Sequence, residues 1–397
     1  MAEVFPFKGV VYDRDYAKEE IMAPPYDVIN DKEKKMLKEK SPFNIVRLTL
    51  PDSYDKAKET LSKWLNDGVL KFDEQCCFYS YQCDYEFEGK NIRLNGFIAA
   101  LKVEEFGGSV KPHEKTLKGP KIDRFNLITK TNAMFCPIMG LYNHNKEIEE
   151  ILNIDRESFF EEEFENIKHR IARITDKDQI RTIQNALKSE SIIIADGHHR
   201  YETALMIKEY YNKQGIKEGG FDYIMILLLD AQTGGLSLNP IHRLVKKIDD
   251  FDAFLTELKR YFVIYSEDDG NWDFAMYDGE GFVYLRFKEN KPSDLLKRLD
   301  VSIFEDYIYK KILNLTDKDI KNQRVAGYAH SKDELIELVN SKKARLGFVL
   351  KPMSFEELVE ITNKGLTVPQ KSTFFHPKIP SGLVGYHFKS IEGCRDV

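Results

Sequence analysis

The chain of 397 residues is long enough for about two or three domains, each with a core of its own. Charged residues make up 31% and hydrophobic residues 42%, as in ordinary globular proteins, and no apolar stretch approaches the roughly 20 residues that span a bilayer. The net charge of −6 excludes the broad basic field of a duplex-DNA binder, although it leaves room for a local basic pocket. We therefore expect neither a membrane nor a nucleic acid as partner.

The N-terminal residues and the cysteines favour a cytoplasmic protein. The opening MAEVFPFKGVVYDRDY lacks the basic segment and apolar core of a secretory signal. The cysteines are odd in number and show no C-x-x-C spacing, so we expect reduced thiols at all of them. They are Cys76, Cys77, Cys83, Cys136 and Cys394.

The first part of the chain alternates helical and strand patterns. In chain order we expect a helix at 54–66, strands at 76–87 and 92–106, a loop at 107–121, a helix at 123–133, a strand at 135–142 and a helical region at 146–190. The first helix carries Ala57, Leu61 and Trp64 on one face. The two long strands flank an EGKN turn and predict a β-hairpin in a β-rich region of about 75–145.

The stretch SIIIADGHHRYETAL at 191–205 joins a strand to a helix. Residues 192–194 form a β-branched apolar run that suits a buried strand. From Tyr201 the apolar residues recur at three-to-four spacing, and Gly215 is placed to end the helix. The pentad DGHHR at 196–200 therefore lies on a strand-to-helix turn.

The second part of the chain predicts further α and β elements. YIMILLLD at 223–230 is a continuous apolar run, which favours a central strand buried on both faces. From about residue 248 the pattern restarts, with a helix at 251–262, a hairpin at 276–285 and helices through 296–315. We therefore predict a mixed α/β (α+β) protein with two domains. These are a phosphate-binding core at 1–247 and a C-terminal α/β domain at 248–397 that contributes a closing loop.

The pentad has the composition of an anion site. Backbone N–H groups and the positive end of the dipole at a helix N-terminus attract anions, and Gly197 lets a phosphate approach closely. Arg200 offers a planar fork for two phosphate oxygens, and His198 and His199 can donate hydrogen bonds to others. An aspartate such as Asp196 belongs there only if it binds a metal, orients a histidine or takes a proton from a nucleophile.

Simpler interpretations of the pentad stay open. Asp196 can be a helix N-cap, and the histidines can be surface groups. Adjacent histidines diverge on a helix, so the pentad alone is a poor zinc site. A Mg²⁺ ion held jointly by Asp196 and phosphate oxygens suits the residue types better.

Two segments before the pentad extend the predicted site. In APPYDV the prolines fix a turn from which Tyr26 and Asp27 project, and Asp27 can equally stabilise that turn. His113 and Glu114 lie in the loop rich in Lys and Gly, with Thr116, Lys121 and Arg124 shortly after. This grouping favours a binding loop over solvated polar residues.

Two segments after the pentad are weaker candidates. His242 and Arg243 follow the buried strand and are predicted to contact an anion directly or through a neighbour. Lys371, Ser372 and Thr373 resemble the end of a P-loop only superficially, because no G-x-x-x-x-G precedes them. They suit a loop that closes over phosphate, or simply a polar turn.

Six motifs carry a resemblance to a known family. They are ADGHHRYETAL, APPYDVI, PHEKT, KIDRFNLI, NPIHRLV and PQKSTFFHPK, at 195–205, 23–29, 112–116, 121–128, 239–245 and 369–378. Together they resemble a broad bacterial and archaeal family known as a domain of unknown function. More remotely, DGHHR resembles the phosphate-binding signature of the superfamily that joins sulfiredoxin, the ParB partition proteins and the free-serine kinases. The resemblance implies a ParB/sulfiredoxin-like core.

The members of this superfamily narrow the expected chemistry. Sulfiredoxin has G-G-C-H-R, so Gly197, His199 and Arg200 match its phosphate-cradling part, while His198 replaces its nucleophilic cysteine. That replacement argues against sulfinic-acid repair. The serine kinases carry an Asp-Gly-His version, which this chain resembles more closely. The resemblance implies phosphoryl transfer from ATP, ADP or pyrophosphate to free L-serine, with Mg²⁺ as charge neutraliser.

Under this resemblance the pentad holds the donor phosphates, with Asp196 and His198 taking part in catalysis. The family kinases have a carboxylate base near the N-terminus, which implies Asp27, and Glu114 is the second candidate. The alternative is a ParB-like nucleotide-binding switch or DNA-associated protein, which the acidic balance disfavours. A zinc hydrolase is third. The sequence leaves open the donor, the acceptor hydroxyl compound and whether the chain forms a homo-oligomer.

Overall fold

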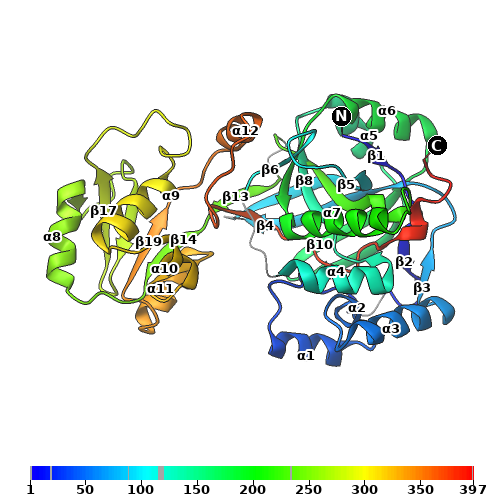
Figure 1. Ribbon diagram of the computed structural model, residues 1–397, viewed down its shortest axis with the longest axis horizontal. Coiled ribbons are helices and arrows are strands. Elements are labelled where there is room, and N and C mark those ends of the chain that lie inside the picture. The colour runs from blue at the N-terminus through cyan, green and yellow to red at the C-terminus, as the bar shows by residue number, and fades with distance from the viewer. Residues whose placement is uncertain (1, 18–19, 88, 115–119, 233–234, 396) are drawn as a thin grey trace. The chain divides into compact units, whose positions relative to one another are not determined.

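The computed structural model describes residues 2–17, 20–87, 89–114, 120–232, 235–395 and 397. Figure 1 shows a chain that divides into a first unit, Met1–Leu236 with Pro377–Val397, and a second unit, Ser237–His376. Both units combine helices with β-sheet, which confirms the expected mixed α/β class. No helix in the described ranges has the length and apolar character needed to traverse a bilayer.

The first unit is built on a large mixed sheet with the strand order β6-β11-β8-β12-β5-β4-β10-β9, in which β1 also pairs with β5. The strands are β6 (Val110–Pro112), β11 (Ile192–Asp196), β8 (Ile138–Tyr142), β12 (Tyr223–Asp230), β5 (Lys90–Lys102), β4 (Phe78–Phe87), β10 (Ile167–Ile174), β9 (Ser158–Phe164) and β1 (Val4–Phe5). β11 runs parallel to β6, and β12 runs parallel to β8. β12 is buried along its whole length, as its apolar run predicts.

Helices cover this sheet, and α7 lies across one face with α4 beside it (Figure 1). The helices of the first unit are α1 (Asp31–Lys40), α2 (Val46–Thr49), α3 (Tyr54–Asn66), α4 (Pro120–Thr131), α5 (Lys146–Leu152), α6 (Lys177–Lys188), α7 (His198–Lys213), η1 (Gly220–Asp222) and η3 (Phe388–Ile391). Two short strand pairs complete it, β2 (Val10–Tyr12) with β3 (Leu70–Phe72) and β21 (Tyr386–His387) with β7 (Ala133–Met134). α3 buries Ala57, Leu61 and Trp64, as predicted.

The region 146–190 is not helical throughout, so that prediction is wrong for its middle part. Between α5 and α6 the chain forms the hairpin β9–β10. Its turn residues Glu165 and Asn166 have φ values of 53° and 62°, and two positive φ angles suit the tight turns that join twisted strands. In β10, buried His169 and Ile171 alternate with partly exposed Arg170, which is the period of a strand with one solvated face.

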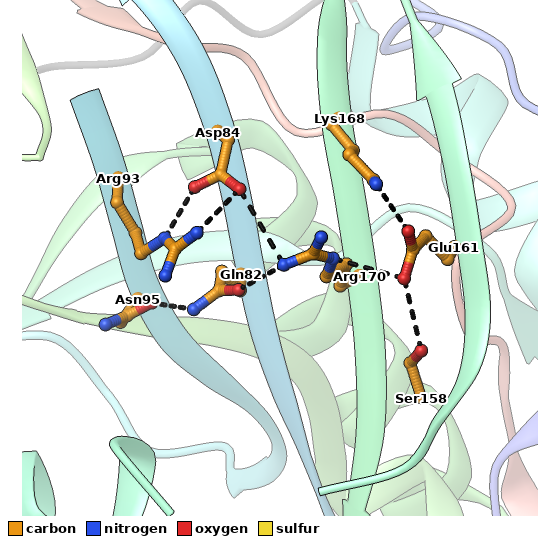
Figure 2. Close-up of polar contacts among 8 residues, drawn as sticks. All are labelled: Gln82, Asp84, Arg93, Asn95, Ser158, Glu161, Lys168 and Arg170. Carbon is orange, nitrogen blue, oxygen red and sulfur yellow. Dashed lines mark hydrogen bonds and ion pairs between the residues drawn. The ribbon is translucent and has the colours of Figure 1, made fainter. Parts of the chain in front are cut away.

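Figure 2 shows the polar side chains that β5, β4, β10 and β9 present on this solvated face. Arg93 pairs with Asp84 at 2.6 Å, and Arg170 lies 3.8 Å from Asp84 and 3.1 Å from Glu161. Lys168 contacts Glu161 at 2.5 Å. Opposite charges on neighbouring strands favour this strand register, although each exposed pair contributes little on its own.

The second unit has a sheet with the order β15-β17-β16-β19-β14-β18 and a separate pair, β13 with β20. The strands are β15 (Phe262–Tyr265), β17 (Phe282–Phe287), β16 (Phe274–Tyr277), β19 (Leu346–Leu350), β14 (His242–Val245), β18 (Ala326–Ala329), β13 (Ser237–Pro240) and β20 (Thr373–His376). The helices are α8 (Phe251–Tyr261), α9 (Asp300–Ile303), the π-helix η2 (Phe304–Ile312), α10 (Asp317–Asn322), α11 (Lys332–Asn340) and α12 (Phe355–Asn363).

The boundary between the units differs from the predicted division at 247/248. β14 pairs with β18 and β19, so residues 237–247 belong to the second unit. The C-terminal segment, Pro377–Val397, returns to the first unit, where β21 pairs with β7. The restart of the hydrophobic pattern near residue 248 marks the start of α8. Strand pairing over long sequence distances decides to which unit residues 237–247 and the C-terminal segment belong.

The returning segment also corrects the prediction for the cysteines. Cys76 and Cys394 form a disulfide across 318 residues of sequence, with their Cα atoms 5.5 Å apart. The free cysteines among the described residues are Cys77 and Cys83, both buried, and Cys136. The expectation of reduced thiols is therefore wrong for two of the five, because sequence spacing does not reveal that the C-terminus comes back to the start of β4.

Candidate active site

The pentad forms a tight corner between β11 and α7. β11 ends at Asp196, α7 begins at His198, and Gly197 between them has a φ of +91°. A Cβ atom at Gly197 would lie 2.6 Å from Cγ2 of Ile138, so both the backbone conformation and the space require glycine. The first turn of the 16-residue α7 contains no acidic residue, and its positive dipole end stays unopposed within the turn.

Asp196 is held between two cations. Its Oδ2 accepts a hydrogen bond from Nη2 of Arg200 at 2.6 Å, and its Oδ1 accepts one from Nζ of Lys378. Burial alone would raise the pKa of Asp196, but Lys378 and Arg200 together hold it well below its usual value. Asp196 is therefore a carboxylate at neutral pH, and its low basicity makes it a poor general base.

This cluster of one carboxylate and two cations keeps one net positive charge. The side chains of Asp196 and Lys378 are 21% and 26% exposed, and that of Arg200 is 8% exposed. A partly buried net positive charge beside a helix N-terminus attracts anions such as phosphate.

The Mg²⁺ ligand role of Asp196 stays a prediction. Both carboxylate oxygens accept hydrogen bonds from cations, so a metal ion would compete with Lys378 and Arg200 for Asp196. Across the ranges that the structure describes, no group of three or more His, Cys, Asp or Glu side chains is placed to hold a metal.

The guanidinium of Arg200 braces the corner. Besides Asp196, it donates to the carbonyl oxygen of Pro137 at 2.5 Å and to Sγ of Cys136 at 2.9 Å. Burial would lower the pKa of Arg200, but Cys136 and Asp196 raise it, so the charge is permanent. The sequence predicts that Arg200 grips phosphate, whereas in this structure its fork is engaged with β11 and the segment before β8.

His113 and His198 meet at the corner as neutral rings. Nδ1 of His113 donates to the carbonyl oxygen of Ile194 at 2.5 Å, and the backbone N–H of His113 donates to Nε2 of His198 at 3.3 Å. Burial lowers the pKa of His113 to about 4 and that of His198 well below its usual value. Since Nε2 of His198 accepts, its Nδ1 carries the proton, and His198 is a neutral hydrogen-bond donor. His199 is half-buried in the same turn.

The turn at 23–29 lies close to Arg200. The guanidinium carbon of Arg124 lies over the ring of Tyr26, 4.1 Å from the centroid of that ring. Burial raises the pKa of Tyr26 to about 12, and the charge of Arg200 opposes that shift. Asp27 is exposed beside it and close enough to raise the pKa of Cys136. Arg124 donates to the carbonyl oxygen of Thr49 and to Asp123, so its guanidinium is also engaged within the protein.

A pocket adjoins Arg200. Its polar lining consists of Tyr26, Arg124, Cys136 and Arg200 with two threonines, and its apolar lining comes mostly from α4 and residues 133–135. The structure thus brings the turn at 23–29, α4 and the pentad to one place.

The loop at 112–116 is described only in part. Glu114 is half-buried next to His113, and Thr116 lies outside the described residues. Lys121, in the first turn of α4, forms an ion pair with Glu202 of α7, so these two helices are linked beside the corner. Glu114 therefore stays a candidate beside the corner.

The weaker candidates belong to the second unit. Arg243 is fully buried in β14, where it donates to the carbonyl oxygens of Ile241 and Lys371 and pairs with Glu305 at 3.3 Å. Nδ1 of His242 accepts from the backbone N–H of Leu350. Ser372 donates to the carbonyl oxygen of Pro369, and Thr373 begins β20. All these contacts are local to the second unit.

Two residues of the corner were missed by sequence reasoning. The sequence motifs gave Lys378 no assigned role at the corner, and Cys136 was expected only to be a reduced thiol. The signal for Lys378 was its place between Pro377 and Pro380 in the last of the six motifs, where a lysine on a stiff segment can be aimed. Cys136 had no signal, because its contact with Arg200 spans 64 residues.

The family model described as "Protein of unknown function (DUF1015)" matches residues 4–302. The chain belongs to this family. The match confirms the resemblance drawn from the motifs and spans five of the six, while the DUF1015 model stops short of the motif at 369–378. No curated protein matches the sequence.

Solved structures show remote similarity to this DUF1015 chain. A free serine kinase in complex with AMP is 15% identical, with 73% of this chain and 98% of that chain covered and a TM-score of 0.39. A conserved hypothetical protein from Pyrococcus furiosus is 16% identical, with 72% and 93% covered and a TM-score of 0.37. SbnI from Staphylococcus aureus, with a C-terminal truncation, is 11% identical, with 72% and 85% covered and a TM-score of 0.37.

Proposed function

We propose that this protein is a small-molecule kinase that transfers a phosphoryl group from a nucleotide or pyrophosphate to the hydroxyl group of free L-serine. The product is O-phosphoserine. The observation that carries the proposal is the corner at Gly197. There a helix N-terminus without acidic residues meets a partly buried cluster with one net positive charge.

Phosphoryl transfer depends mainly on positioning and on neutralising charge. In the proposed step, the serine hydroxyl oxygen attacks the terminal phosphorus of the donor, and the bond from that phosphorus to the bridging oxygen breaks. The bridging oxygen keeps the electron pair and leaves with the shortened donor, and the hydroxyl proton passes to a carboxylate. The N-terminus of α7 holds the donor, and neutral His198 donates a hydrogen bond to it.

The carboxylate that takes the proton is Asp27 or Glu114 in this proposal. Asp196 is unsuited to the task. Burial raises its pKa, but Lys378 and Arg200 lower it by more, so this carboxylate binds a proton only weakly. Asp27 is exposed at the edge of the site, and Glu114 adjoins His113. Replacing the base with its amide should lower kcat by about 10²-fold or more, while the other replacement should leave kcat nearly unchanged. Kinetics of D27N and E114Q thus identify it.

The direct test incubates the purified protein with Mg²⁺, L-serine and ATP, ADP or pyrophosphate in turn, and detects O-phosphoserine by mass spectrometry. We expect product with at least one donor, and its loss by about 10²-fold or more in D196A and R200A. R93A is the matched control, since it breaks an arginine–aspartate pair on the solvated face of the same sheet (Figure 2). Thermal melting checks folding. Undiminished product in folded D196A and R200A would remove the pentad from the reaction.

A further inference from the structure

Five of the six polar side chains that line the pocket beside Arg200 are engaged in hydrogen bonds within the protein. They are Thr49, Arg124, Thr131, Cys136 and Arg200. The sixth is Tyr26, whose hydroxyl has no hydrogen-bond partner among the described residues. This hydroxyl is not one of the buried polar atoms that lack a partner, so a small molecule can reach it. An accessible, unpaired hydroxyl on a pocket wall is suited to bind a ligand.

The position of Tyr26 is well fixed. The prolines at 24–25 restrict the backbone directly before it. Ahead of them, Ala23 exchanges backbone hydrogen bonds with Ser381. The guanidinium of Arg124 lies over the ring, and Arg124 itself is buried. A side chain held in this way loses little further conformational freedom when a ligand binds, which favours affinity.

The charges around the Tyr26 hydroxyl favour a negatively charged partner. Burial and the nearby Asp27 raise the pKa of Tyr26 to about 12, so the hydroxyl keeps its proton at neutral pH. Arg200 and Arg124 oppose this shift, because their positive charges act on the hydroxyl. Both arginines line the pocket, whereas the carboxylates that pair with them do not. A ligand in the pocket therefore meets a hydroxyl donor beside two permanent cations, a set that matches carboxylate oxygens.

The remaining lining of the pocket is apolar and comes mostly from α4 and residues 133–135. Such walls suit the carbon atoms of a small molecule. Arg200 belongs both to this lining and to the corner at Asp196. A molecule in the pocket therefore lies next to the donor phosphates of the proposed reaction, where the acceptor has to be.

We infer that Tyr26 is a specificity-determining residue whose hydroxyl donates a hydrogen bond to the carboxylate of the acceptor amino acid in this pocket. The inference rests on the proposed phosphoryl transfer and deepens it, because it names a group that distinguishes an amino acid from other hydroxyl compounds. The carboxylate is not the reacting group, so its contact is equally strong before and in the transition state. Tyr26 should therefore set the KM for the acceptor more than kcat.

The test compares Y26F with Y210F. Both remove one phenolic oxygen, and Tyr210 is an exposed residue of α7 that does not line this pocket. The acceptors are L-serine and ethanolamine, which is serine without its carboxylate. We expect Y26F to raise the KM for L-serine by about 10-fold or more, with kcat and the donor KM nearly unchanged. With ethanolamine, Y26F should match the wild type, and Y210F should match it with both acceptors.

A binding measurement keeps the test independent of turnover. L-alanine carries the carboxylate and ammonium groups of serine but no hydroxyl, and calorimetry should show that Y26F binds it about 10-fold or more weakly than Y210F does. Because the Tyr26 hydroxyl has no partner in the described ranges, Y26F should melt within about 2 °C of the wild type. A larger fall would reveal an internal partner and overturn the inference. Where ethanolamine is not turned over, its inhibition constant replaces its KM.

Each outcome decides one question. If the wild type phosphorylates no acceptor, the proposed function fails, and L-alanine binding by Y26F and Y210F still decides the role of Tyr26, since no binding to either overturns it. If the wild type forms O-phosphoserine and Y26F keeps the wild-type KM for L-serine, the inference is wrong and the kinase stands. Equal losses with L-serine and ethanolamine would mean that the hydroxyl contacts another group of the acceptor, which also overturns the carboxylate contact.

Discussion

The chain contains three His-Arg pairs, of which His169-Arg170 lies in β10. The other two, His199-Arg200 in the first unit and His242-Arg243 in the second, lie in very different surroundings. Arg200 lies in the first turn of a helix, shares Asp196 with Lys378 and borders a pocket. Arg243 lies inside a strand and is fully buried. Among the described residues, Glu305 is the only side chain with which it forms an ion pair. The same dipeptide thus builds a charged corner in one place and a sheet core in the other.

The difference lies in charge balance and backbone position. The Arg243–Glu305 pair is electrically neutral. Burial raises the pKa of Glu305, and the opposing effect of Arg243 is smaller, so the pKa stays above its ordinary value. The cluster around Asp196 contains two cations, Lys378 and Arg200, and adjoins helix N–H groups. An arginine in a sequence motif is therefore not sufficient for an anion site. It needs a surplus of charge, and a backbone terminus that faces the anion.

The largest expected contrast is in activity. R200K keeps the charge but loses the fork that binds Asp196, Cys136 and Pro137 together, so kcat should fall by about 10²- to 10³-fold. R243K should leave kcat close to that of the wild type, because its contacts are local to the second unit. Phosphoserine formation by the two variants measures the contrast. An inactive but folded R243K would return the second pair to the reaction.

The next contrast is in stability. R243M leaves Glu305 buried without its partner and should lower the unfolding free energy by about 3–5 kcal/mol. The double variant R243M/E305Q, in which no buried charge is left unpaired, should recover part of that loss. The two tryptophans lie in different units, Trp64 in the first and Trp272 in the second. Urea unfolding followed by Trp272 fluorescence in a W64F background therefore reports the second unit.

Local patterns predicted much of the fold. α3 begins and ends as expected because Ser53 caps it and Gly68, with a φ of +75°, ends it. The apolar run of β12 identified the strand between β8 and β5. The hairpin β9–β10 was missed because its acidic outer face resembles a solvated helix, and only the positive φ pair at Glu165 and Asn166 sets the reversal.

The site was predictable only where its residues are neighbours in sequence. The strand-to-helix corner at Gly197 followed from an apolar run, a glycine and a helical period. The partners of that corner come from far away, Lys378 from 182 residues and Cys136 from 64 residues along the chain. The contact of Lys378 depends on where the C-terminal segment returns, and no local sequence pattern indicates that.

A smaller effect compares two glycines with positive φ, one in each unit. G279A should cost about 1–2 kcal/mol, since its φ is +101° and only Val339, at 3.8 Å, lies near the new Cβ. G197A carries the same backbone cost and also places Cβ 2.6 Å from Ile138, so its loss should be larger. Trp64 and Trp272 report the two units separately. Equal losses would show that Ile138 moves aside freely.

The smallest effect is the pH dependence of the two carboxylates, and it should have opposite signs. Burial raises the pKa of Asp196, but Lys378 and Arg200 lower it by more, so the pKa lies below its ordinary value of 3.8. Its stabilisation is therefore complete above about pH 3.8 and is lost as the pH falls through the lowered value. Burial leaves the pKa of Glu305 above its ordinary 4.5, despite Arg243. The stability linked to Glu305 is complete below that pH and is lost as the pH rises through the raised value.

Amide variants separate the pH-dependent stability linked to Asp196 from that linked to Glu305, because an amide does not titrate. The stability of the wild type relative to D196N should be constant above pH 5 and should shrink on acidification below about pH 3.8, with Trp64 as the probe. The stability of the wild type relative to E305Q should fall as the pH rises above about 4.5, with Trp272 as the probe. Slopes of the same sign would mean that the two arginine–carboxylate pairs sit in equivalent electrostatic environments. In that case the second cation at Asp196 would no longer distinguish the corner from the core.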